Sequence, residues 1–182
     1  MIIGIDPSLV STGYCTIDRH RRVLDQGRIE TKKLRGPERL KYIKEELTHI
    51  LYRFDNIDFV CIEDYSFGSQ GRAVFQIGEL GGVIRVLLYE SIIPYIEIAP
   101  TCLKKFVTGK GNSKKDEVML HVFKRWGFEA KNSDEADAYA LAQMGIAIAT
   151  GDHGLTQAQA EALEKPRRAF ELLMCEKEEL NV

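Results

Sequence analysis

The chain begins with Met1-Ile2-Ile3-Gly4-Ile5-Asp6-Pro7-Ser8, an apolar run that ends in a single carboxylate. A run of β-branched residues without polar alternation is typical of a central strand that is covered on both faces. Pro7 has no N–H to donate and ends the strand, so the side chain of Asp6 is expected at the strand's C-terminal end. A rigid strand end suits a metal-binding or catalytic group, although a turn aspartate is the alternative interpretation of Asp6 alone.

Two more strands are predicted directly after the first. The pair Thr12-Gly13 is predicted to form a tight reversal, with the residues up to Ile17 in a second strand. Polar residues 18–22 form the next turn, and residues 23–30 form a third strand. The fold is therefore expected to open with a three-stranded meander.

A second apolar run repeats the design of the first. Residues 58–63 end in Glu63, and they follow a helix that is predicted from Gly36 to Phe54 by its apolar spacing. Strands joined by a crossover helix tend to lie parallel, so their C-terminal ends, with Asp6 and Glu63, are expected to be neighbours. Two buried carboxylates raise each other's pKa, and a cation between them removes that cost.

The last core helix is predicted to begin around residues 132–137 and to run to Ala149. Asp134 and Asp137 are three residues apart and share one face of its first turn. Complementarity with the helix dipole is the alternative explanation for Asp134. Asp137 lies among small alanines, which predicts a helix that is pressed tightly onto the sheet.

The length of 182 residues, with 45% hydrophobic and 29% charged residues, predicts one soluble globular domain of ordinary size. No apolar run is long enough to span a bilayer and no signal peptide pattern is present, so we expect a cytoplasmic protein without membrane association. The four cysteines lack the spacing of a zinc site or a disulfide framework.

The net charge of −2 hides an uneven distribution. Residues 101–126 contain seven lysines and arginines against two acidic residues, a local charge of +5. Ser113-Lys114-Lys115-Asp116 is predicted to cap a helix, with Lys115 in its first turn. A basic surface suited to nucleic acid is therefore expected within an acidic chain.

The other predicted elements complete one domain, residues 1–150, and an extension, residues 151–182. A helix is expected from Ala73 to Tyr89, in which Gly78, Gly81 and Gly82 permit close packing against another helix or subunit. A strand from Pro94 to Ile98 and a helix over 100–107 follow. In the acidic extension, two helices are predicted on either side of Lys165-Pro166.

Over roughly residues 1–150 the chain resembles the RuvC family of Holliday-junction resolvases, within the RNase H-like superfamily. The resemblance rests on four motifs in order: Ile3-Gly4-Ile5-Asp6-Pro7 with Thr12-Gly13, then Ile62-Glu63, then Lys104 and Gly109 before Lys115, and Asp134-Glu135-Ala136-Asp137-Ala138. Ser8 departs from this pattern, because the family more often has glycine there.

The resemblance implies an α/β, RNase H-like fold with a mixed five-stranded sheet flanked by helices. It also implies a metal-dependent endonuclease that resolves four-way DNA junctions by paired symmetric nicks, as a homodimer and with no identified helicase partner. Two Mg²⁺ or Mn²⁺ ions would bind the four carboxylates, with Lys115 near the scissile phosphate. DNA contacts would come from five residues: Lys104, Lys110, Lys115, Arg72 and Phe67, with Tyr65 the second candidate for base stacking.

Three other functions are weighed against this one. An actin-like or sugar-kinase ATPase shares the first apolar strand, but its two lobes and second phosphate loop need a longer chain. A nuclease of broader branched-DNA or RNA–DNA hybrid specificity stays open. A catalytically silent junction-binding protein is disfavoured, because a binder of phosphates gains nothing from clustered negative charge.

Overall fold

The computed structural model of the chain describes residues 1–65, 72–151 and 154–180, with the side chains of 72–73 and 176–180 left aside. Its strands are β1 (Ile2–Asp6), β2 (Ser11–Ile17), β3 (Val23–Glu30), β4 (Phe59–Glu63) and β5 (Tyr95–Ile98). Its helices are α1 (Gly36–Leu51), α2 (Arg72–Glu90), α3 (Pro100–Thr108), α4 (Lys115–Trp126), α5 (Ser133–Thr150) and α6 (Gln157–Leu180). No helix in the described part of the chain is long and apolar enough to cross a membrane.

The strands form one mixed sheet in the order β3-β2-β1-β4-β5. β1 pairs antiparallel with β2 and parallel with β4, so the first strand of the chain is the central one. The predicted meander, the parallel crossover and the mixed five-stranded sheet are thereby confirmed.

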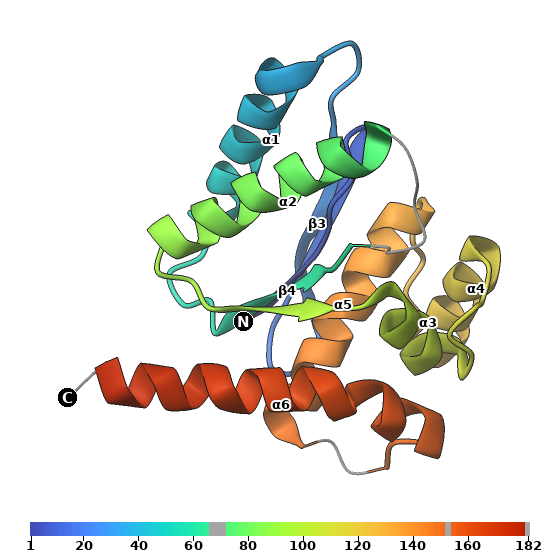
Figure 1. The fold of residues 1–182 in the computed structure, drawn as a ribbon. Helices are drawn as coiled ribbons and strands as arrows, with labels where there is room; N and C mark the ends of the chain where they lie inside the picture. Colours follow the sequence, from blue (N-terminus) through green and yellow to red (C-terminus); the bar gives the residue numbers. More distant parts are fainter. Residues whose placement is uncertain (66–71, 152–153, 181–182) are drawn as a thin grey trace.

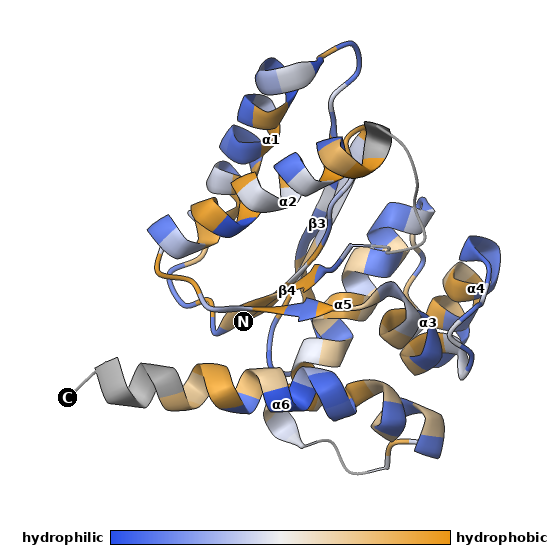
Figure 2. Ribbon diagram, viewed as in Figure 1, coloured by the Kyte–Doolittle hydropathy of each residue, from blue (hydrophilic) through white to orange (hydrophobic). Residues whose placement is uncertain are grey.

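Side chains that alternate along β1 contribute to two cores. Ile3 and Ile5 are buried with residues of α1 and α2, whereas Ile2 is buried with residues of α5 on the other face. Figure 1 shows α1 and α2 on one side of the sheet and α5 on the other, with α3 and α4 beside it. In Figure 2 strand β4 has the colour of hydrophobic residues, as a strand covered on both faces requires.

The reversal after β1 lies earlier than predicted. Thr12 and Gly13 belong to β2, and Gly13 pairs with Asp6. The chain reverses over residues 7–10 because the Thr12 hydroxyl donates to the Ser8 carbonyl at 2.7 Å. The Ser8 hydroxyl oxygen in turn accepts two backbone N–H groups at 3.4 Å. The serine that departs from the family pattern thus stabilises the turn.

Two helix predictions also need correction. Ser113 does not cap α4, since its hydroxyl pairs with Thr108 at 2.7 Å and the N-cap is Lys114, without a side-chain bond. The extension forms one helix, α6, with Pro166 inside it, where a break was predicted.

Packing explains why α6 continues through a proline that costs roughly 3 kcal/mol in a helix interior. Leu163 is fully buried before the proline, and after it the Phe170 ring lies 4.8 Å from the ring of Phe59. Glu161 of α6 also pairs with Lys105 of α3 at 2.5 Å. α6 therefore shares the core of the sheet and steadies α3, as its position below the sheet in Figure 1 indicates.

Candidate active site

Two carboxylates end neighbouring parallel strands. β1 and β4 are in register, with Ile5 opposite Ile62, so Asp6 and Glu63 come next on the two strands. Their side chains are hydrogen-bonded to each other, and Asp6 is only 6% exposed. The parallel arrangement that the sequence predicted thus brings the two acids together.

The first turn of α5 supplies two more carboxylates. The Asn132 side chain accepts the N–H of Glu135 at 3.0 Å, and the Glu135 carboxylate accepts a backbone N–H of the preceding segment at 3.1 Å. The Glu135 side chain is therefore engaged in capping the start of α5. Asp134 and Asp137 lie on the face toward the strands, where the charge of each raises the pKa of Asp6.

Two glycines bring α5 close enough to place those acids. A Cβ on Gly4 would collide with the carbonyl oxygen of Ala138, and one on Gly13 with the carbonyl oxygen of Asp134. Glycine is therefore required at both positions because backbone meets backbone there. The prediction that α5 is pressed onto the sheet is confirmed, but the two glycines that permit it were not identified from the sequence.

Burial raises the pKa values of three of the carboxyl groups, which favours their protonated forms. Burial raises the pKa of Asp6 well above its usual range, and the nearby Glu63 and Asp137 raise it further. Burial also raises the pKa of Asp137, to about 7, with Glu63 adding to the effect. For Glu63, burial raises the pKa while the hydrogen bond from Asp6 opposes the rise. Burial and the neighbouring charges therefore favour the protonated form of Asp6 more than that of Glu63.

Two of the predicted lysines lie beside the acids. Lys115 begins α4, and its Nζ is 3.8 Å from Oδ1 of Asp134 while 65% of its side chain is exposed. The charge of Lys104 on α3 lowers the pKa of both Glu63 and Asp137, so it faces the same cluster. An exposed pair at such a distance contributes about 0–1 kcal/mol, which leaves Lys115 able to turn toward a phosphate.

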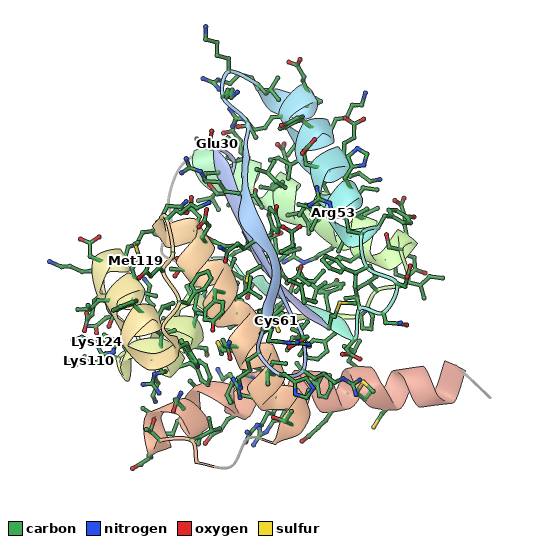
Figure 3. The ribbon with its side chains drawn as sticks, turned by 180° about the vertical axis from the view of Figure 1, so that it is seen from behind. Glu30, Arg53, Cys61, Lys110, Met119 and Lys124 are labelled. Atoms are coloured by element: carbon green, nitrogen blue, oxygen red, sulfur yellow. The ribbon has the colours of Figure 1, made fainter. Side chains whose placement is uncertain are left out.

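Of the remaining predicted DNA contacts, the structure describes the side chains of Lys110 and Tyr65. Lys110 is exposed in the turn between α3 and α4, where Figure 3 labels it. Phe67 lies outside the described residues, as does the side chain of Arg72 at the start of α2. Tyr65 is described, and its hydroxyl donates to the Gly78 carbonyl at 3.2 Å. Tyr65 therefore packs against α2.

The donor set fits a hard divalent cation. Mg²⁺ and Mn²⁺ prefer carboxylate oxygens, and a positive ion would replace the proton that Asp6 shares with Glu63. Among the described residues, no three His, Cys, Asp or Glu side chains already form a metal cage. This arrangement is compatible with Mg²⁺, which binds through one or two carboxylates and completes its shell with waters and substrate phosphates.

The sheet order β3-β2-β1-β4-β5, with helices on both faces, is that of an RNase H-like fold, and acidic residues lie at the ends of β1 and β4 and at the start of α5. The family model described as crossover junction endodeoxyribonuclease RuvC matches residues 2–145. The chain therefore belongs to the RuvC family, a family of metal-dependent nucleases.

Curated relatives and solved structures agree with this assignment. The RuvC of Caldicellulosiruptor saccharolyticus is 32% identical over 80% of this chain and 91% of its own length. The RuvC of Prochlorococcus marinus is 34% identical over 80% of this chain and 97% of its own. The structure of Thermus thermophilus RuvC with a Holliday junction substrate superposes with a TM-score of 0.69 at 24% identity, over 82% and 95% of the two chains. This likeness confirms the fold.

Proposed function

We propose that this chain is a crossover junction endodeoxyribonuclease, which hydrolyses one phosphodiester bond in each of two opposed strands of a four-way DNA junction. One observation carries the proposal: four carboxylates from three separate elements lie near enough for their charges to act on one another, at a partly buried site that two lysines face. Such a cluster is costly to bury unless cations enter it, and cations beside lysines suit a phosphodiester substrate. The printed names of the relatives agree with this activity.

Two Mg²⁺ or Mn²⁺ ions would be held by the carboxylates of Asp6, Glu63, Asp134 and Asp137. When bound, such a pair lowers the pKa of an attacking water and stabilises the charge on the leaving 3′ oxygen. Asp6 holds a proton on its carboxyl group and releases it when positive charge enters the cluster. The ends of β1 and β4 and the first turn of α5 keep these oxygens in place, because all three are rigid elements.

The lysines orient the substrate. Lys115 is exposed and weakly paired, so its ammonium moves to a phosphate oxygen without a large loss of free energy. Lys104 adds a second positive charge on the same side of the cluster. Lys110 extends the basic surface toward a neighbouring phosphate. Phe67 is proposed to stack on an unpaired base at the branch point, and Arg72 to contact the backbone beside it.

A homodimer is proposed because two symmetric nicks need two sites. The outer face of α2 supports it, since Phe75, Val86 and Tyr89 are 75%, 52% and 83% exposed. Gly78 and Gly82 have open space where a side chain would stand. Large apolar side chains beside bare backbone on one helix suit close packing against a second copy.

The dimer proposal is tested with Val86→Glu, measured by sedimentation against the unchanged chain. We expect the variant to sediment as a monomer, because a buried carboxylate is costly at an apolar contact. Leu120→Glu on α4 is the matched control, since Leu120 is 49% exposed. A wild-type chain that is monomeric throughout the concentration range contradicts the proposal.

The activity is tested with a labelled four-way junction, a linear duplex and an RNA–DNA hybrid, each with Mg²⁺ or with EDTA. We expect paired symmetric nicks in the junction alone and only with metal. Cleavage of the duplex or the hybrid assigns the broader nuclease instead, and tight binding of the junction without cleavage under Mg²⁺ and Mn²⁺ assigns a silent binding protein. An enzyme acting on chromosomal DNA junctions in bacterial cells works in the cytoplasm, which is where we propose that this chain acts.

A further inference from the structure

A row of paired residues leads from the acidic cluster to the outer strand of the sheet. Asp6 on β1 is opposite Gly13 on β2, and Gly13 is opposite Arg28 on β3. Residues in one row point to one face of a sheet, so Arg28 lies on the face that α5 covers, about 10 Å from Asp6. Its side chain is 41% exposed and pairs with Glu30. Because a surface ion pair is weak, the Arg28 guanidinium is able to turn to another anion.

Beyond this row, β3 leads into a turn that contains three cations and no carboxylate. This basic turn, residues 31–37, has the sequence Thr-Lys-Lys-Leu-Arg-Gly-Pro. Lys32 and Lys33 are exposed, and neither forms an ion pair with any residue that the structure describes. The Arg35 guanidinium donates to backbone carbonyl oxygens, that of Leu34 at 2.9 Å and that of Lys32 at 3.5 Å. The positive charge of the turn is therefore directed to the solvent without a neighbouring acid to balance it.

Hydrogen bonds tie the basic turn to the turn that follows β1. Thr31 is buried, and its hydroxyl and its N–H donate to the backbone carbonyls of residues 9 and 10, at 2.7 Å and 3.1 Å. Arg39, which is 8% exposed, donates twice to the Leu34 carbonyl, at 2.9 Å and 2.7 Å. Lys32 has a φ of 46°, a left-handed conformation that a residue with a side chain keeps only where its surroundings impose it. The lysines therefore stand on a fixed support.

The basic turn and Lys104 lie on opposite sides of the acids. In the sheet order β3-β2-β1-β4-β5, β3 is one edge, whereas Lys104 belongs to α3, which follows β5 at the other edge. β3 runs in the direction of β1, so its C-terminal end lies at the end of the sheet that carries Asp6. Figure 1 shows β3 and α1 meeting there, at the top of the view, and Figure 3 labels Glu30 where the basic turn begins.

Two strand spacings and the few residues beyond the row place the basic turn roughly 15 Å from Asp6. Phosphates of one DNA strand follow each other about every 3.4 Å along the helix axis. A duplex with one phosphate at the acids therefore carries others, several nucleotides away, at the distance of the basic turn.

We propose that Arg28 and the basic turn form a second phosphate-binding surface, which holds a duplex arm of the junction on the β3 side of the acids. The inference rests on the proposed function. A strand whose phosphate lies at the acids contacts Lys104 on one side and Arg28, Lys32 and Lys33 on the other. This surface binds the charge of the DNA backbone, so it contributes affinity and orientation and takes no part in the chemical step.

The test removes two charges from the basic turn in the variant Lys32→Gln/Lys33→Gln. Lys165→Gln/Arg168→Gln is the matched control, because it removes the same charge from exposed residues of α6, the helix that packs on Phe59 at the opposite end of β4. The readouts are junction affinity in EDTA across a range of salt concentrations, single-turnover nicking at saturating enzyme, and the melting temperature. Junctions with one uncharged methylphosphonate, placed in turn on either side of the scissile phosphate, locate the contact.

We expect the basic-turn variant to bind the junction about tenfold more weakly at about 0.1 M salt, with a salt dependence lower by about two ions. Its nicking rate at saturation and its melting temperature match those of the wild type. A methylphosphonate on the β3 side weakens binding of the wild type and has no further effect on the variant, whereas the control variant behaves as the wild type.

Equal weakening by the two variants overturns the inference, because the lysines then act only through the net charge of the chain. Wild-type nicking together with an unchanged affinity and salt dependence of the basic-turn variant also overturns this inference alone. A wild-type chain that neither binds nor nicks the junction overturns the proposed function as well.

Discussion

The acidic and the basic halves of the candidate site are built in different ways. The carboxylates stand on the ends of β1 and β4 and on a helix whose backbone touches the sheet at Gly4 and Gly13. The lysines stand on α3 and α4, beside the sheet, and Lys115 reaches the cluster with a long exposed side chain. The acids are therefore fixed by backbone contacts, whereas the lysines keep the freedom to follow a phosphate.

The largest effect is expected from removing the central carboxylate of the acidic half, that of Asp6. Asp6→Asn removes the carboxylate that shares a proton with Glu63, and we expect cleavage of the junction to fall by roughly 10³-fold or more. Binding of the junction in EDTA should persist, because without metal the raised pKa of Asp6 already favours the uncharged carboxyl group that the amide resembles. Single-turnover cleavage and gel-shift titrations measure the two quantities. Asp25→Asn, on a surface ion pair, is the control, and equal activity of both variants contradicts the assignment.

The second prediction separates backbone placement from side-chain chemistry. Gly13→Ala inserts a methyl group against the Asp134 carbonyl, so we expect a loss of about 3 kcal/mol in the free energy of unfolding, together with weaker binding of Mn²⁺. Urea denaturation and metal titration by calorimetry measure both. Val10→Ala is the control, because the Val10 side chain is 63% exposed in the turn after β1. A stable Gly13→Ala with normal metal affinity would show that α5 has room to move.

The same contrast explains how much the sequence could predict. Asp6 and Glu63 were expected to be neighbours because a crossover helix makes strands parallel, and this local rule holds in the register of β1 and β4. Asp134 and Asp137 were likewise expected on one face of a helix turn, because they are three residues apart. These predictions needed only short-range patterns.

Contacts between distant segments were beyond such patterns. Gly13 was assigned to a turn, because Thr-Gly pairs favour turns, but it meets Asp134 more than a hundred residues away. Pro166 was taken as a helix break, because its cost is local whereas the packing of Leu163 and Phe170 that offsets it is tertiary. Tyr65 likewise has its hydrogen-bond partner Arg85 on another element, so this contact has no local signature.

The third prediction contrasts two lysines of the basic half. Lys115→Met should lower the single-turnover rate about 100-fold with little change in junction affinity, because its charge faces the acids at 3.8 Å from Asp134. Lys110→Met should lower affinity only a few fold and reduce the salt dependence of binding by about one ion, as expected for an outer phosphate contact. Single-turnover cleavage rates and salt titrations of junction binding, measured for both variants, test these two expectations. Equal effects of the two substitutions would remove the distinction between a catalytic and a peripheral lysine.

The smallest effect concerns the stability of the acidic half without metal. Because burial raises the pKa of Asp137 from 3.8 to about 7, the folded chain binds more protons than the unfolded chain between these values. The stability that this proton provides is fully present below about pH 4 and is lost as the pH rises through about 7.

Asp137→Asn replaces the carboxyl group with an amide that does not ionise, so the free energy of unfolding no longer falls as the pH rises. In EDTA at about pH 8 we expect the variant to be more stable than the wild type by about 2 kcal/mol, with a flatter pH dependence. Urea denaturation across this pH range measures the difference. Glu129→Gln, on an exposed residue, serves as the control. With Mg²⁺ in excess the order should reverse, because the wild type gains stability from the metal that the amide binds poorly. A variant that is less stable than the wild type in EDTA contradicts this prediction. It would mean that favourable contacts hold the Asp137 carboxylate and that its burial has no electrostatic cost for a metal to remove.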